Sequence, residues 1–269
     1  MSVAPLSSFS AERLPDPDGG LLWFAMLGPL EIAVAGARTP VTSIRARSLL
    51  TSLLLQRNQV VRLDRLIESI WEAPPPTALP QVRNIVAELR RTLRAAVRGR
   101  EIIETSPGGY RLVVTDDEVD VARAEDYLSQ GMAAVRNDNH HLALESFARS
   151  LDLWRGEPLG DVAPVLARAW RPRFAELRRR GLLGRTKSRL ALGMEELVVG
   201  ELFDAVAEFP FDEELRLLLV TALYNRGRTT AALEVCRETR RYFFEHLGID
   251  AGSTLRDLEV QILRDESSG

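Results

Sequence analysis

The chain has 269 residues, of which 45% are hydrophobic and 27% are charged, and its formal net charge is −3. This composition is typical of globular protein, and the length allows two domains with separate cores. The single cysteine, Cys236, excludes an internal disulfide and favours a reducing cytoplasm.

The beginning of the chain predicts neither a folded segment nor a membrane anchor. Ser, Pro, Asp and Gly dominate residues 1–20, which predicts a disordered leader, and the basic-then-apolar order of a targeting segment is missing. The apolar run of residues 21–27 stops at Gly28 and Pro29, far short of a membrane span. We therefore expect a cytoplasmic protein that does not bind membranes.

A small sheet and a first helix are predicted next. Residues 23–34 are typical of strands, and a turn at Ala35-Gly36 leads into a further extended segment at residues 39–41. Residues 43–55 predict a helix with one apolar face. The residues of that face, all expected to be core, are Ile44, Leu49, Leu50, Leu53 and Leu54.

Two helices and a turn follow. Residues 64–71 predict a short amphipathic helix, and Pro74-Pro75-Pro76 forces a turn after it. Residues 77–98 predict a second helix with one buried stripe, because apolar residues recur at i, i+3, i+4, i+7 and i+11. Those apolar residues are Val82, Ile85, Val86, Leu89 and Leu93. Pro80 can be accommodated in the first turn, which would start the helix near Leu79.

Residues 102–114 predict a β-hairpin with Pro107-Gly108-Gly109 at its tip. The order helix, turn, helix, hairpin is typical of a recognition helix with a wing, and at about 100° per residue the mostly basic face of that helix points away from the core. The residues expected at base edges or in the groove are Gln81, Arg83, Asn84, Glu88 and Arg91. The residues expected on phosphate are Arg45, Arg47, Arg90, Arg94, Thr105, Tyr110 and Arg111.

Several of these assignments have open alternatives. Arg45 and Arg47 lie in the first turn of a helix, where cations oppose the helix dipole, so they would either reach phosphate or stay solvated. Glu88 would either accept from a cytosine amino group or pair with an arginine of its own helix. Tyr110 would either approach the duplex or pack against the sheet.

The charge is divided unevenly along the chain. Residues 21–115 carry 13 arginines and 7 acidic residues, a net charge of +6, whereas residues 116–269 carry −7. A basic first domain implies a polyanionic partner, and an acidic second domain implies a different task. The acidic residues at the boundary, 116–118 and Asp120, predict a solvated linker.

Residues 116–269 predict an all-α domain. The segments with helical periodicity are 121–135, 142–154, 166–192, 195–208, 213–224, 229–246 and 253–263. Gly193 and Gly227 lie 34 residues apart and each precedes a helix, which is the tetratricopeptide period. Residues 142–144 indicate a third unit, with 166–192 as an insertion.

No catalytic, metal or cofactor site is predicted. His140 and His141 are adjacent, His246 is distant, and no Cys or carboxylate stands at metal-ligand spacing from them. The sequence contains no G-x-S-x-G turn for a nucleophile and no G-x-x-x-x-G-K-[ST] loop for nucleotide phosphates. We therefore expect a binding protein that is not an enzyme.

A series of short motifs runs through residues 22–264. It includes Phe24-x-x-Leu27-Gly28-Pro29-Leu30-Glu31, Leu89-Arg90-Arg91-x-Leu93, Pro107-Gly108-Gly109-Tyr110, Leu153-Trp154-Arg155-Gly156 and Leu247-Gly248-Ile249. In content and order it resembles the Streptomyces antibiotic regulatory proteins. The resemblance implies an OmpR-type winged helix over residues 21–115 and a tetratricopeptide-like bacterial transcriptional activation domain over residues 116–269.

The resemblance also implies a function. Such an activator binds direct repeats in double-stranded promoter DNA, with two protomers head to tail, and helps RNA polymerase to transcribe a secondary-metabolite gene cluster. It implies that Glu72, Pro74 and Pro75, in the turn of residues 72–79, contact the polymerase; the alternative is that the prolines only aim the next helix. A second interpretation is an interaction or ligand-sensing scaffold with a weakened winged helix, which Pro80 and Glu88 motivate.

Overall fold

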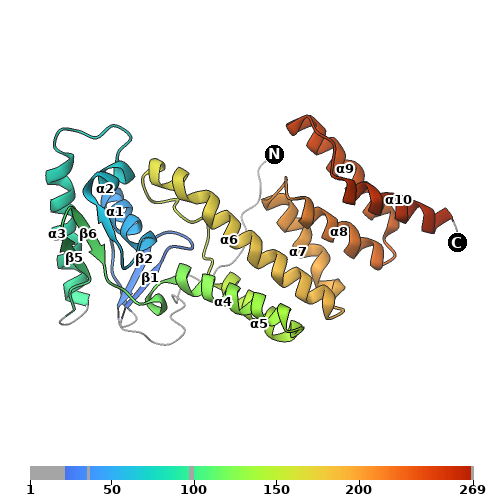
Figure 1. Cartoon of the computed structure of the whole chain (residues 1–269), viewed down its shortest axis with the longest axis horizontal. Helices are drawn as coiled ribbons and strands as arrows, with labels where there is room; N and C mark the ends of the chain where they lie inside the picture. Colours follow the sequence, from blue (N-terminus) through green and yellow to red (C-terminus); the bar gives the residue numbers. More distant parts are fainter. Residues whose placement is uncertain (1–21, 35–36, 97–99, 268–269) are drawn as a thin grey trace. The chain divides into compact units, whose positions relative to one another are not determined.

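The computed structural model describes residues 22–34, 37–96 and 100–267. The predicted leader, the turn at Ala35-Gly36 and the last residues of the predicted helix 77–98 lie outside them. Figure 1 shows the helices and strands, coloured along the sequence. The chain divides into two compact units. The first comprises the described residues up to Tyr127 together with Arg149–Arg178, and the second comprises Leu128–Ala148 and the described part of Arg179–Gly269. The predicted fold class, mainly α with a winged helix first, is confirmed.

Two small antiparallel sheets lie in the first unit. The first has the order β1 (Leu22–Ala25), β2 (Glu31–Val34), β3 (Ala37–Arg38). The second has the order β4 (Val60–Arg62), β6 (Gly109–Leu112), β5 (Ile103–Ser106). The third strand of the first sheet ends before the extended segment predicted at residues 39–41. Pro40 lacks the N–H that a ladder needs, so pairing stops ahead of it.

Three helices complete the winged helix: α1 (Ile44–Leu55), α2 (Leu63–Ile70) and α3 (Ala78–Ala96). Leu49, Leu50, Leu53 and Leu54 of α1 are fully buried, as predicted. Ile44 is not, because it occupies the first position of α1 and the buried face begins at Ala46; 54% of Ile44 is exposed. The predicted stripe of α3 packs inward, with Ile85 half-buried and the other four residues buried.

The compact unit continues beyond residue 115, through a short 3-10 helix, η1 (Asp116–Glu118), into α4 (Asp120–Arg136). The prediction of a solvated linker is wrong at Asp120, which is 1% exposed. Its carboxylate accepts backbone hydrogen bonds at the end of β1, so the start of α4 is fixed to the first sheet. Val119 bridges Phe24 beside it.

Helices α5 (His140–Asp152) and α6 (Pro164–Ala191) follow, and α4, α5 and α6 each contribute residues to both units. The second unit continues with α7 (Glu195–Glu208), α8 (Glu213–Asn225), α9 (Thr229–Leu247) and α10 (Ser253–Ser267). Gly193 and Gly227 have φ of +69° and +68° before α7 and α9, which only glycine adopts freely. The two helices begin 34 residues apart, as the repeat predicts.

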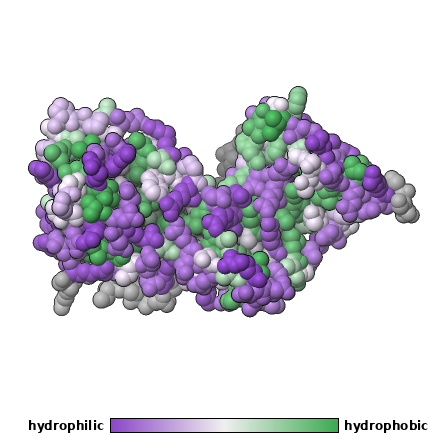
Figure 2. Space-filling view, in the orientation of Figure 1, coloured by the Kyte–Doolittle hydropathy of each residue, from purple (hydrophilic) through white to green (hydrophobic). Residues whose placement is uncertain are grey.

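Figure 2 shows that hydrophilic residues cover most of the visible face, with smaller hydrophobic areas between them. In the part of the chain that the structure describes, every helix is too short or too polar to cross a membrane.

Candidate nucleic-acid interface

The α2–α3 pair is built as the sequence predicts. Pro74-Pro75-Pro76 lie in the turn after α2, and the carbonyl of Pro75 accepts a hydrogen bond of 2.9 Å from the N–H of Ala78, the first residue of α3. Pro80 lies within the first turn of α3, where a missing N–H costs no helical hydrogen bond. The helix therefore continues without a break from Pro80 to Ala96.

The outer face of α3 carries a row of exposed polar residues: Arg83, Asn84, Glu88 and Arg91. Among the residues described, none of these four side chains makes a hydrogen bond, an ion pair or a ring contact. Their hydrogen-bonding groups are open to solvent. Side chains in that condition, on the exposed face of a helix, are free to bind an external partner.

Gln81, at the start of the same face, differs from these four residues because its side chain makes two hydrogen bonds. Its Oε1 accepts a hydrogen bond of 2.8 Å from Nη1 of Arg45, and its Nε2 donates one of 2.8 Å to Oγ1 of Thr77. The Arg45 guanidinium also lies over the Trp71 ring, 5.4 Å from its centroid. Arg45, Gln81 and Thr77 thus form a chain of hydrogen bonds beside the first turn of α3.

Arg90 joins α3 to the hairpin. Its Nε donates to the Ile103 carbonyl at 2.9 Å and its Nη2 to Oγ1 of Thr105 at 2.8 Å. The guanidinium lies 5.7 Å from the centroid of the Tyr110 ring. Tyr110 is 8% exposed, so of the two roles left open for it, packing against the sheet is the one observed.

The hairpin of β5 and β6 has a tight glycine tip. Gly108 has φ of +77°, and a Cβ at Gly109 would overlap the backbone carbonyl of Val61 on β4. Across the hairpin, Arg111 pairs with the carboxylate of Glu104 directly opposite it, at 2.5 Å. The charge predicted to meet phosphate is therefore partly neutralised within the wing.

The guanidinium of Arg47 is bound within the first compact unit. Its Nε donates to the carbonyl of Asp161 at 2.8 Å and its Nη1 to the carbonyl of Val41 at 3.0 Å. The carboxylate of Asp161 is 3.4 Å from Nε. These groups hold Nε and Nη1 of Arg47. Arg94 stays 67% exposed, with Glu101 at 3.8 Å.

The residues predicted to meet the polymerase lie between α2 and α3. Glu72 and Pro74 are exposed, and Pro75 is half-buried. Glu72 pairs with Arg168 of α6, a residue of the same compact unit. Sequence patterns contain no sign of this ion pair, because the two residues are 96 positions apart.

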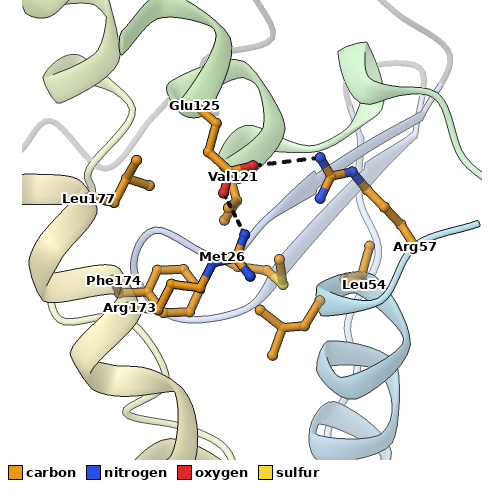
Figure 3. Close-up of a pocket in the computed structure, with 9 residues that line it drawn as sticks. Met26, Leu54, Arg57, Val121, Glu125, Arg173, Phe174 and Leu177 are labelled. Atoms are coloured by element: carbon orange, nitrogen blue, oxygen red, sulfur yellow. Dashed lines mark hydrogen bonds and ion pairs between the residues drawn. The ribbon is translucent and has the colours of Figure 1, made fainter. Parts of the chain in front are cut away.

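Figure 3 shows a small pocket in the first unit, lined mainly by apolar residues that include Met26, Leu54 and Phe174. At its rim Glu125 pairs with Arg173 at 2.8 Å and with Arg57 at 3.7 Å. The space open to a water-sized sphere is about 10 Å³, the lower limit for one water molecule. Over the described ranges, no three His, Cys, Asp or Glu residues gather as metal ligands.

Comparison with known proteins identifies both parts of the chain. Residues 40–112 match the family model "Transcriptional regulatory protein, C terminal", and residues 119–263 match "Bacterial transcriptional activator domain". The transcriptional regulatory protein MoaR1 of Mycobacterium bovis is 32% identical over 256 residues, which cover 91% of this chain and 80% of MoaR1. This chain belongs to the Streptomyces antibiotic regulatory protein family of transcriptional regulators.

Other members of the family are longer. The regulatory protein AfsR of Streptomyces coelicolor is 34% identical over 251 residues, and the match covers 93% of this chain but only 25% of AfsR. The solved structure of Mycobacterium tuberculosis EmbR, in complex with a low affinity phosphopeptide, aligns with a TM-score of 0.86 at 30% identity. It covers 91% of this chain and 65% of the EmbR chain.

The activator-domain match begins at residue 119, but the compact unit that contains the winged helix extends to Tyr127 and includes Arg149–Arg178. The start of the family's activator domain is thus packed with the DNA-binding fold. Ala163 donates to Oγ of Ser48 at 2.8 Å, and Arg155 donates to the Leu27 carbonyl at 2.7 Å. Sequence reasoning missed these contacts because each involves backbone groups without a residue signature: the N–H of Ala163 in the first, and both partners in the second.

Proposed function

We propose that this regulator is a transcriptional activator that inserts α3 into the major groove of promoter DNA. The observation that carries the proposal is the exposed row of Arg83, Asn84, Glu88 and Arg91, whose side chains have no partner in the described chain. A row of donors and acceptors on one helix matches the hydrogen-bonding edges of bases in the major groove, which is wide enough for a helix. Membership of a transcriptional regulator family supports the same assignment.

Within this row the roles follow from hydrogen-bonding capacity. Asn84 has the amide that reads adenine through N6 and N7, and Arg83 and Arg91 have the paired donors that read guanine or bind phosphate. Glu88 accepts from a cytosine amino group, although its charge repels phosphate. We assign Asn84 the largest contribution to base preference.

Phosphate contacts flank the row. We assign them to Arg45 and Arg94, which are exposed, and to Thr105, whose hydroxyl accepts from Arg90 and can still donate to phosphate. Arg111 contributes as well, weakened by Glu104. Arg90 instead holds the wing against α3.

The family extends the proposal to direct repeats in a promoter, with two protomers arranged head to tail, and to a secondary-metabolite gene cluster as the target. We further propose that the turn after α2 contacts RNA polymerase. Glu72 and Pro74 are exposed there, and successive prolines fix φ, which lowers the entropy lost when the turn meets a partner.

The alternative, a scaffold with a weakened winged helix, rested on Pro80 and Glu88. Because Pro80 does not interrupt α3, it no longer supports the scaffold alternative. Glu88 remains as a negative charge on the outer face.

Binding of the whole chain to duplex DNA at two salt concentrations tests the proposal. A protein that contacts about six phosphates loses roughly 10³ in affinity between about 50 and 200 mM salt. We expect such a loss, together with a preference for duplexes selected from a random pool. Binding that is weak at both salt concentrations and shows no selected sequence would favour the scaffold.

A further inference from the structure

The hydrogen bonds of Gln81 point to a role other than base reading. Bidentate recognition of adenine needs the amide oxygen to accept from N6 and the amide nitrogen to donate to N7. In this structure Oε1 of Gln81 already accepts from Arg45, and Nε2 already donates to Thr77. Gln81 is also half-buried, whereas Asn84, one turn further along α3, is exposed and has no partner in the described chain.

The side chain of Arg45 is held in place, but most of its hydrogen-bond donors remain available. One of its five N–H donors is bound to Gln81, and its guanidinium plane is backed by the Trp71 ring at 5.4 Å. No carboxylate of the described residues pairs with it. The guanidinium is thus fixed on one edge and one face, while its other donors are exposed beside the first turn of α3.

This combination matches what a phosphate needs from an arginine. Arg binds phosphate through two parallel N–H donors, and the cost of binding lies largely in ordering its long, flexible side chain. A side chain ordered before the DNA arrives does not incur that cost again on binding. Arg47, two residues along the same helix, is less available for phosphate, because its Nε and Nη1 donate to backbone carbonyls and the Asp161 carboxylate lies beside Nε.

We infer that Gln81 is a positioning residue that, with Thr77 and Trp71, holds Arg45 in place as a clamp for one backbone phosphate, and that it does not read a base. The inference rests on the proposed DNA binding by α3. It moves Gln81 from the residues that set sequence preference to those that set overall affinity.

A double-mutant cycle tests the inference on the whole chain, with a duplex that the wild-type protein selects from a random pool and with all its single base-pair variants. We expect Gln81→Ala to weaken binding to every duplex about fivefold, the value of one net hydrogen bond, and to leave the base preference unchanged. Arg45→Ala should also weaken binding uniformly and reduce the salt slope by about 1. The double variant should bind no more weakly than Arg45→Ala alone.

Thr77 supplies a second test, since its hydroxyl fixes the amide. Thr77→Val should reproduce the uniform loss of Gln81→Ala, and Thr77→Ser, which keeps the hydroxyl, should bind as the wild type does. A change of preference at one base pair in Gln81→Ala, or additive losses in the double variant, would overturn the inference. Failure of the wild-type protein to bind DNA in a salt-dependent way would instead refute the proposed function, before any variant is compared.

Discussion

The carboxylate of Asp120 accepts a hydrogen bond of 2.6 Å from the backbone N–H of Met26, 94 residues earlier in the chain. The same oxygen accepts from the N–H of Leu27 at 2.7 Å, and the other oxygen accepts from Val121 at 2.7 Å. Full burial raises the pKa of Asp120 to about 6, against the opposing effect of these N–H donors. The start of the activator domain is therefore attached to the winged helix through a titratable group.

The first prediction concerns the pH dependence of stability. The folded-state pKa of about 6 lies above the unfolded value of about 3.9, so between these values only the folded chain binds the extra proton. The contribution of Asp120 to the free energy of unfolding should rise by about 2 kcal/mol as pH falls from 7 to 4. Urea unfolding of the wild type and of Asp120→Asn, measured across this range, isolates that contribution. A constant difference between the two proteins would contradict the prediction.

The second prediction concerns the packing of the second unit. Phe147 of α5 is buried against Gly131 of α4 and Gly184 of α6, and a Cβ at either glycine would overlap the Phe147 ring. Gly184→Ala should lower the free energy of unfolding by about 1–3 kcal/mol, the usual cost of overpacking. Gly200→Ala in α7 is the matched control. No atom lies near its added Cβ, so it should be neutral or stabilising by up to about 1 kcal/mol. Equal stability of the two variants would refute the packing argument.

The third prediction concerns the wing. Because Glu104 lies directly opposite Arg111 and pairs with it, Glu104→Gln should release the guanidinium for phosphate. DNA affinity should increase for all sequences, and the salt slope should steepen by about 0.9, the value for one added phosphate contact. Anisotropy titrations at several salt concentrations measure both. If Arg111 does not meet DNA, the slope will stay at the wild-type value.

The fourth prediction concerns the turn after α2. Glu72→Ala with Pro75→Ala should leave promoter binding intact and lower transcription in a purified polymerase assay. Arg168→Ala is the control, because it breaks the same ion pair and leaves the turn itself unchanged. Equal loss of transcription in Arg168→Ala would mean that the pair to α6 matters and the turn does not. Loss of promoter binding along with transcription would make the turn a scaffold.

Sequence reasoning succeeded where the signal is local. The stripe of α3 follows from one helical period, and the start of α3 follows from the fixed φ of Pro80. The starts of α7 and α9 follow from the 34-residue spacing of the two glycines that precede these helices.

Sequence reasoning failed where a residue's partner is distant in the sequence or is a backbone group. Arg45 and Arg47 both fall in the first turn of α1, and periodicity does not reveal that only Arg47 meets Asp161, 114 residues away. Asp120 looked like part of a solvated strip because its partners are backbone N–H groups, which no residue pattern marks. The sequence left two roles open for Tyr110, because its burial depends on the sheet and on Arg90, which lie around it only in the folded chain.

The central claim is that the outer face of α3 reads bases, and the base preference of Asn84→Ala tests it most directly. Preference profiles of the wild type and the variant are to be measured on the same random duplex pool, with Arg94→Ala as the contrasting variant. We predict that Asn84→Ala loses about 1–3 kcal/mol of discrimination at one base position. Arg94→Ala should weaken binding uniformly and reduce the salt slope by roughly 1. An unchanged profile in Asn84→Ala, together with unchanged affinity in Arg94→Ala, would contradict the account.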